Sequence, residues 1–134
     1  DPGLQQILDQ AYGYAVFPEI GKGGAIVGGA YGRGIVYEQG RKVGFVELNQ
    51  GSIGAQLGGQ TFSEIIVFSN RAALDRLKAG NFDLGADASA VVLTTGAAAG
   101  ARFERGVAVF VLPQGGLMVD VSVNGQQLNY QPRG

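Results

Sequence analysis

Glycine is unusually abundant in this chain, and it lies inside apolar runs rather than in polar linkers. There are 24 glycines among 134 residues, whereas a typical protein contains ~7% glycine. Only four prolines accompany them, so the composition differs from that of a flexible Gly/Ser linker. Because glycine has no Cβ, it allows positive φ angles and close contact between backbones. The sequence therefore predicts strands that bend, bulge or approach another backbone closely.

Short apolar runs separated by turn signals predict a series of strands. Gln39-Gly40 and Asn124-Gly125 are two-residue signals typical of β-hairpins. Pro18 is expected to end the first strand, and the segment Gly32-Arg33-Gly34 is expected to separate two others. Strands are predicted at residues 14–17, 25–31, 34–38, 43–48, 52–57, 62–68, 107–112, 117–123 and 126–130.

Two segments have helical patterns. In residues 4–10 the apolar positions are spaced by three and four residues. Residues 71–79 are rich in helix formers, with Asn70 placed as the N-cap and Gly80 as the C-terminal left-handed residue. Residues 86–101 combine alanines, which favour a helix, with β-branched residues, which favour a strand, and we predict a strand there.

These elements predict one α+β domain that spans residues 1–134. Its sheet is expected to be mostly antiparallel, curved or barrel-like, and built of short Gly-rich strands, with one or two short helices packed on it. Residues 15–27 weakly resemble residues 108–119. We interpret this as convergence on common hairpin sequences, because two occurrences do not establish a repeat.

The composition excludes several chemistries. With no Cys and no His, the chain has no disulfide, thiolate nucleophile, Cys-ligated metal or imidazole base. A formal net charge of −1 argues against a dedicated nucleic-acid-binding protein. We expect no cofactor, no metal site and no catalytic residue. The sequence begins at Asp1 rather than at Met, so we expect a processed or trimmed product from which any targeting segment has been removed.

Two short motifs allow both a functional and an ordinary interpretation. Gly21-Lys22-Gly23-Gly24 resembles a phosphate-binding loop, because successive glycine N–H groups can surround an anion. A Gly-rich turn with a solvated lysine is the commoner meaning of such a pattern. Asp83 and Asp87 offer oxygen ligands for a cation, but they lack the spacing of a calcium loop. They are typical of solvated loop carboxylates.

Several longer segments form an ordered pattern along nearly the whole chain. They are Ala11-Tyr12-Gly13-Tyr14-Ala15-Val16-Phe17-Pro18, Gly21-Lys22-Gly23-Gly24, Gly28-Gly29-Ala30-Tyr31-Gly32, Gly54-Ala55-Gln56-Leu57-Gly58-Gly59-Gln60, Ser63-Glu64-Ile65-Ile66-Val67-Phe68, Ser89-Ala90-Val91 and Gly115-Gly116-Leu117-Met118. Together they resemble the SYLF-domain family, in its bacterial branch. The resemblance implies a non-enzymatic, lipid-binding module, and it carries over no catalytic residue.

The same resemblance implies a partner and a location. The expected partner is a phospholipid or membrane surface, and the expected location is the bacterial cell envelope, either periplasmic or lipid-anchored at the outer membrane as a lipoprotein. Eukaryotic members bind phosphoinositides, and some engage actin. They use a basic amphipathic N-terminal segment, whereas residues 4–10 contain no Lys or Arg and include Asp9. Phosphoinositide specificity is therefore not carried over.

We predict that anionic head groups bind a basic surface that includes Lys22, Arg33, Arg41 and Lys42. Lys22 lies in a Gly-rich turn, Arg33 is flanked by two glycines, and the other two follow a hairpin turn. Guanidinium groups can bind phosphate with two hydrogen bonds, and Lys contributes a point charge. The alternative is a protein-interaction or structural module of the envelope without direct lipid binding. A third hypothesis is a hydrolase with two carboxylates across a cleft.

Overall fold

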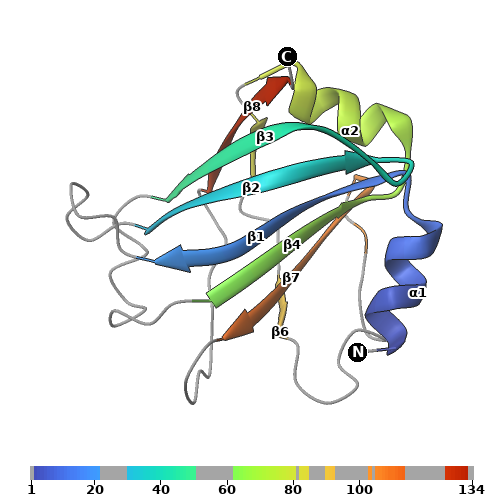
Figure 1. Cartoon of the computed structure of the whole chain (residues 1–134), viewed down its shortest axis with the longest axis horizontal. Coiled ribbons are helices and arrows are strands. Elements are labelled where there is room, and N and C mark those ends of the chain that lie inside the picture. The colour runs from blue at the N-terminus through green and yellow to red at the C-terminus, as the bar shows by residue number, and fades with distance from the viewer. Residues whose placement is uncertain are drawn as a thin grey trace.

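A computed structural model of the chain describes residues 2–21, 30–50, 62–80, 82–84, 90–92, 103, 105–113 and 126–132. The strands among them form one eight-stranded sheet in the order β5-β8-β3-β2-β1-β4-β7-β6 (Figure 1). Neighbouring strands are antiparallel except β6 and β7, which are parallel. In chain order the elements are α1 (Pro2–Gln10), β1 (Gly13–Gly21), β2 (Ala30–Glu38), β3 (Arg41–Gln50), β4 (Phe62–Phe68), α2 (Arg71–Lys78), β5 (Phe82–Asp83), β6 (Ala90–Val92), β7 (Val107–Pro113) and β8 (Gln127–Pro132).

The sheet is strongly curled. β5 and β6 lie at opposite edges, although only residues 84–89 separate them in the chain. In a flat sheet, edge strands seven spacings apart would be roughly 34 Å from each other. A connection of this length spans at most about 25 Å. The sheet must therefore curve into a half-barrel, which confirms the predicted α+β fold with a mostly antiparallel, curved sheet.

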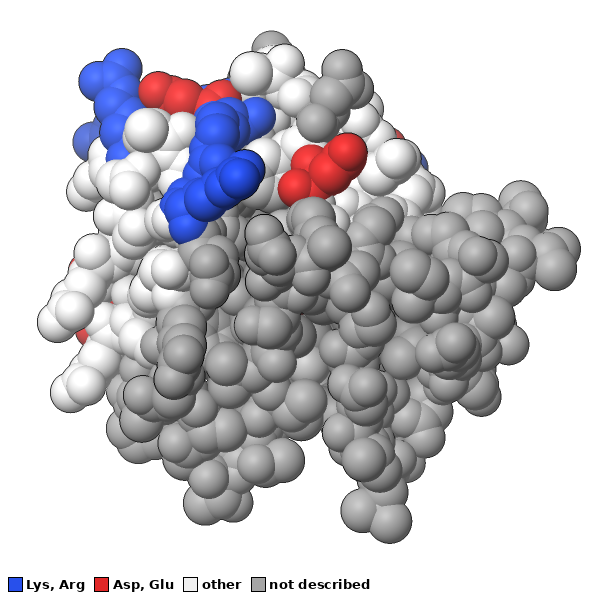
Figure 2. Space-filling view, turned by 180° about the vertical axis from the view of Figure 1, so that it is seen from behind, with Lys and Arg blue, Asp and Glu red and all other residues white. Residues whose placement is uncertain are grey.

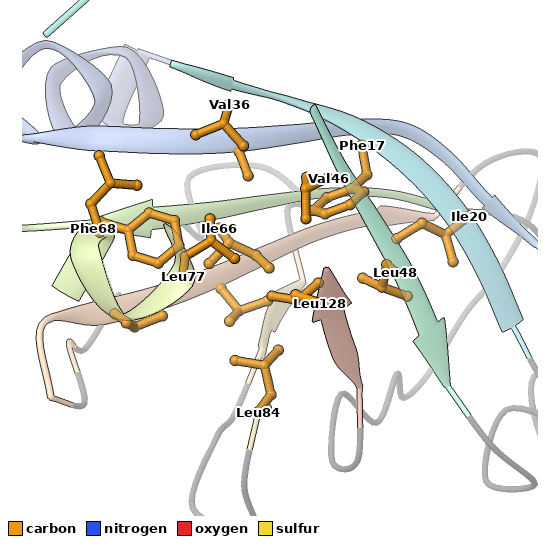
Figure 3. Close-up of a cluster of buried hydrophobic side chains, with 14 of the residues drawn as sticks. Phe17, Ile20, Val36, Val46, Leu48, Ile66, Phe68, Leu77, Leu84 and Leu128 are labelled. Atoms are coloured by element: carbon orange, nitrogen blue, oxygen red, sulfur yellow. The ribbon is translucent and has the colours of Figure 1, made fainter. Parts of the chain in front are cut away.

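The main hydrophobic core fills the inner face of this curl, where α2 also packs (Figure 3). Alternate residues of the strands point into it, among them Phe17 of β1, Val36 of β2 and Leu48 of β3, all fully buried. α2 contributes Leu74 and Leu77. Burial of this face fixes the register of the strands, because a slip of one residue would turn the whole apolar set outward.

Two glycines make room for aromatic rings on the inner face. A Cβ on Gly34 would lie 2.7 Å from the carbonyl oxygen of Val16 and 2.8 Å from the ring of Phe17. A Cβ on Gly44 would lie 2.7 Å from the ring of Tyr130. Contacts under 3.0 Å are essentially never made by real Cβ atoms. The close approach that the glycine content predicts thus occurs at both positions.

A smaller apolar cluster lies on the opposite, outer face of the sheet. There Val67 of β4 and Ala108 and Phe110 of β7 are buried beneath apolar residues of α1, which include Leu4 and Ile7. The two helices therefore cover opposite faces of the sheet. Since α1 packs over β4 and β7, it leaves the outer face of β2 and β3 outside this cluster.

Several predicted elements are confirmed. β4 has the predicted bounds, and α2 begins after Asn70, whose side-chain oxygen accepts a hydrogen bond of 2.8 Å from the backbone N–H of Ala73. Gly80 has the predicted positive φ, 93°. Gln39 and Gly40 both have positive φ, 53° and 80°, as a two-residue hairpin turn requires.

Two predicted boundaries were wrong. β1 does not end at Pro18 but continues to Gly21, because a register shift between Phe17 and Ile20 accommodates the proline. The hydroxyl of Ser63 donates a 2.7 Å hydrogen bond to the Pro18 carbonyl at this point. The segment from Gly32 to Gly34 lies within β2 and pairs continuously with β3, so it does not separate two strands.

Some predictions lie outside the described residues. These are the strands at 52–57 and 117–123, residues 25–29 of a third strand, and the Asn124-Gly125 turn. Of the strand predicted at 86–101, Ala90–Val92 forms β6, and the remainder is outside the described part of the chain.

Candidate functional site

The structure places two of the four residues predicted to bind head groups on the same face of the sheet. Arg33 lies on β2, and Lys42 is near the start of β3; both are exposed. Strand pairing sets Lys42 opposite Tyr37, so four residue positions of β2, about 14 Å, separate it from Arg33. Side chains alternate between the two faces of a sheet, so Arg33 and Tyr37 share the outer face. Lys42 shares it as the partner of Tyr37, because a register shift at Val43 interrupts the alternation along β3.

The other two predicted residues are placed differently. Arg41 is exposed but pairs with Glu38 at the end of the β2–β3 hairpin. Its side chain therefore points to the opposite face of the sheet from that of Lys42. Lys22 lies outside the described residues. The head-group role predicted for all four residues stays a prediction.

An exposed aromatic residue lies between the two outer cations. Phe45 of β3 pairs with Ile35 of β2, midway between Arg33 and Lys42 on the same face. Its side chain is 44% exposed, and the Lys42 ammonium lies 4.7 Å from the centre of its ring. At this distance a cation is attracted by the ring face. We name Tyr31, Arg33, Ile35, Lys42 and Phe45 the outer patch.

The guanidinium of Arg33 is oriented by a short hydrogen-bond chain. Its Nε donates to the hydroxyl of Tyr31 at 3.1 Å, and this hydroxyl donates to Oε2 of Glu47 at 3.1 Å. Neither Arg41 nor Lys42 forms an ion pair with a carboxylate among the described residues. Within the described part of the chain, Lys42 thus has no carboxylate partner, and the hydrogen bond of Arg33 to Tyr31 uses its Nε.

Phe45 was not singled out by the sequence reasoning, although the sequence contains a signal for it. In the run from Val43 to Leu48, Phe45 shares its parity with Glu47, whereas Val46 and Leu48 share the other parity. A strand with a glutamate on one face normally turns that face outward. The buried Val46 and Leu48 and the exposed Phe45 follow this rule, whereas Val43, at the register shift, packs against the inner core.

The basic residues of α2 are already engaged. Lys78 forms an ion pair with Glu38, which also accepts a hydrogen bond from the Tyr12 hydroxyl. These two bonds, that of Lys78 first, hold the pKa of Glu38 below its ordinary value. The Nε of Arg71 lies 3.7 Å from an Oδ of Asp75. The guanidinium of Arg76 donates a hydrogen bond to the backbone carbonyl of Arg105. Figure 2 accordingly shows basic and acidic side chains next to each other along the upper part of its view.

One buried polar pair was also missed by the sequence reasoning. Glu64 of β4 points to the inner face and is fully buried, and the Gln126 amide donates a 3.0 Å hydrogen bond to its Oε1. Burial raises the pKa of Glu64 to about 8, although the bond from Gln126 acts in the opposite direction. Because β1, β2 and β3 lie between β4 and β8 in the sheet, this bond crosses the interior of the curl.

Other kinds of site are small or absent in the described part of the molecule. A hollow of about 170 Å³ lies against α1 and is lined in part by Ile7 and Phe103, whereas small-molecule sites usually measure ~300–1,000 Å³. The described residues include no group of three or more acidic side chains placed to hold a metal ion. None of the described helices has the length and apolarity needed to span a membrane. Asp83 is exposed on β5, and Asp87 lies outside the described residues.

The described residues thus form a curled sheet whose outer face carries two exposed cations and an exposed aromatic ring. Residues 49–132 match the Ysc84 family, described as "Las17-binding protein actin regulator". The match covers more than half of the chain, so the chain belongs to this family of SYLF-domain proteins. The family consists of non-enzymatic binding domains and is associated with lipid and protein binding.

A curated relative agrees with this assignment. The chain is 24% identical, over 129 residues, to Beta cell expansion factor A of Aeromonas veronii. The aligned region covers 94% of this chain and 48% of that protein. The chain therefore spans about half the length of this relative.

Proposed function

We propose that this chain is a non-enzymatic domain that binds anionic phospholipid head groups at a membrane of the bacterial cell envelope. The observation that carries the proposal is the placement of Arg33 and Lys42 on one exposed face, on either side of a solvent-accessible aromatic ring. Membership of a family associated with lipid binding supports the same function.

The chemistry of this face sets the expected mode of binding. Guanidinium and ammonium groups bind phosphate oxygens through charge-assisted hydrogen bonds. Each Lys or Arg close to an anionic bilayer adds ~1 kcal/mol of attraction, which falls off within a Debye length. With so few cations, binding is weak, reversible and strongly reduced by salt.

Co-sedimentation with vesicles tests this function. The chain is mixed at low salt with vesicles of phosphatidylcholine alone and with vesicles of phosphatidylcholine and phosphatidylglycerol in a 3:1 ratio. We expect binding to the anionic vesicles only, and we expect 0.5 M NaCl to abolish it. The variant with alanine at Lys22, Arg33, Arg41 and Lys42 is expected to lose this binding while keeping its melting temperature. Undiminished binding by that variant would reject the basic surface as the contact.

A second candidate function is protein binding without direct contact to lipid. It is favoured by the family description, which names a Las17-binding actin regulator. Under this alternative, anionic vesicles would not sediment the chain even at low salt. The same vesicle experiment therefore separates the two functions.

A further inference from the structure

The outer face of the sheet carries an apolar row that continues beyond the part covered by α1. Strand pairing sets Phe45 opposite Ile35, Ile35 opposite Val16, and Val16 opposite Ile65. Ile65 packs in the cluster beneath α1. The row thus starts under the helix on β4, crosses β1 and β2 as half-buried side chains, and ends on β3 at Phe45.

Phe45 lies in a regularly paired part of β3: the register shift between β2 and β3 falls at Val43, and from Gly44 onward the two strands pair residue by residue. The neighbours of Phe45, Val46 and Gly44, are buried on the inner face, and β3 is paired on both sides, with β2 and with β8. The strand therefore holds the ring of Phe45 outward at a fixed position. A fixed, exposed aromatic ring in a continuous apolar row is typical of a surface that meets another apolar phase.

Tyrosines surround the row on the same face. Tyr14 and Tyr37 stack with their ring centroids 5.2 Å apart, each two residues along its strand from the row, and Tyr31 lies beyond Arg33 on β2. Tyrosine is enriched at the boundary between lipid and water, because one end of its ring is apolar and its hydroxyl is polar. Phe45 and these tyrosines give this face the composition of a membrane-interface belt.

The charges on this face favour an anionic bilayer over a second copy of the chain. Lys42 and Arg33 lie on the two sides of Phe45 along the strand direction, and both remain exposed. The acidic Glu47, on the same face, is half-buried and accepts the hydrogen bond from Tyr31. Two copies stacked on this patch would bring like cations together around the rings, whereas an anionic surface supplies phosphates to both cations at once.

We propose that Phe45 is a membrane anchor, which enters the boundary between the head groups and acyl chains of an anionic bilayer while Lys42 and Arg33 contact phosphates on either side. This inference rests on the proposed lipid-binding function and adds the apolar part of the contact. In Phe45→Ala, affinity for anionic vesicles is expected to fall about 10-fold, because the variant no longer gains the free energy of moving the exposed part of the ring from water into the bilayer. The salt dependence is expected to persist, because the cations remain.

A tryptophan scan of two positions gives a direct test. The chain contains no Trp, so Phe45→Trp and Phe103→Trp each carry a single fluorescent reporter. Phe103 is the matched control, because its exposure of 42% is nearly that of Phe45 and it lies outside the row. Both variants are titrated at low salt with 3:1 phosphatidylcholine–phosphatidylglycerol vesicles, with and without acyl chains brominated near the head group. Melting temperatures equal to that of the wild-type chain verify that both variants fold.

We expect the emission of Phe45→Trp to shift to the blue and to be quenched by brominated lipid, and that of Phe103→Trp to change little. If the wild-type chain sediments with the vesicles but Phe45→Trp shows neither effect, the anchor is rejected and the lipid-binding function stands. If the wild-type chain does not bind, the lipid-binding function itself is rejected. A blue shift that depends on protein concentration without vesicles would instead assign the row to self-association and overturn the anchor.

Discussion

The two faces of the curled sheet are both apolar, yet they are in very different surroundings. On the inner face, Phe17 and Phe62 are fully buried beside α2 and the returning β8. On the outer face, Val16 and Ile35 are only half-buried, and Phe45 is 44% exposed. Adjacent residues of one strand thus differ in burial: on β1, Phe17 is fully buried and Val16 is half-buried. The curl of the sheet decides which face is closed, so hydrophobicity along the strands does not by itself identify the core.

The largest expected difference between the faces comes from removing a phenylalanine. Phe17→Ala on the inner face is expected to lower the free energy of unfolding by about 3–5 kcal/mol, since it removes a buried ring and leaves a cavity. Phe45→Ala on the outer face is expected to lower it by less than about 1 kcal/mol. Urea titrations of both variants measure the difference. Similar losses of unfolding free energy in the two variants would show that Phe45 is also buried in the folded chain.

The second prediction concerns the ionisable group on the inner face. The pKa of Glu64 is about 8 in the folded chain, and its ordinary value is 4.5. Between these pH values the unfolded chain has lost the proton and the folded chain keeps it. Stability therefore falls as pH rises through this window, by up to about 1.4 kcal/mol per pH unit, and changes no further from this group above the folded pKa.

Glu64→Gln isolates this effect. The amide keeps an oxygen that can accept the Gln126 hydrogen bond, and it cannot ionise. Phe17 of β1 and Val111 of β7 flank Glu64 in the sheet, and burial and Gln126 are the causes of the pKa shift, with no charged neighbour contributing. We expect the variant to gain roughly 3 kcal/mol over wild type between pH 5 and pH 7. Parallel stability curves for the two proteins would contradict a buried neutral acid.

The third prediction compares two adjacent residues of β2 that face opposite sides. Gly34→Ala is expected to lower the free energy of unfolding by about 1–3 kcal/mol, because the new Cβ would overlap the Val16 carbonyl and the Phe17 ring. Arg33→Ala, one position away on the outer face, is expected to change it by less than about 0.5 kcal/mol. Thermal unfolding of the two variants provides the measurement. If Gly34→Ala left the free energy of unfolding unchanged, β1 and β2 would be able to move apart at this point without loss of stability.

Local signals in the sequence predicted the elements better than their surroundings. The Asn70 cap, the Gln39-Gly40 turn and the strand at 62–68 depend on residues adjacent in the chain, and all three are confirmed. Pro18 and the glycines at 32 and 34 were misjudged, because pairing with both neighbouring strands keeps β1 and β2 extended through them. Such tertiary support is not encoded in the local pattern.

The candidate site was only partly predictable for the same reason. The sequence indicated basic residues near turns, but it contained no register, and the register is what groups Arg33 with Lys42 and places Arg41 on the other side. Glu64 shares its parity with Phe62 and Ile66, which would have placed it inside. However, β4 carries apolar residues on both faces, since its outer face is covered by α1. The alternation of apolar and polar residues therefore did not show which face of β4 is the inner one.

The smallest expected effect on stability accompanies a clear effect on binding. The double variant Arg33→Ala, Lys42→Ala removes two positive charges from the outer patch, and Arg71→Ala, Arg76→Ala removes two from α2 on the other side of the sheet. Both are expected to change the free energy of unfolding by less than about 1 kcal/mol, because exposed charges contribute little. On 3:1 phosphatidylcholine–phosphatidylglycerol vesicles, the first is expected to weaken binding by more than 10-fold, since each lost contact is worth ~1 kcal/mol.

The α2 variant has the same net charge, so it is expected to weaken vesicle binding by less than about threefold through the long-range field alone. The single variant Arg41→Ala sharpens the comparison further. If register decides the contact, Arg41→Ala resembles the α2 variant, whereas Lys42→Ala alone costs about fivefold in affinity. Equal losses for Arg41→Ala and Lys42→Ala would show that the membrane meets the end of the hairpin rather than the outer face. The binding surface would then lie around the Gln39-Gly40 turn.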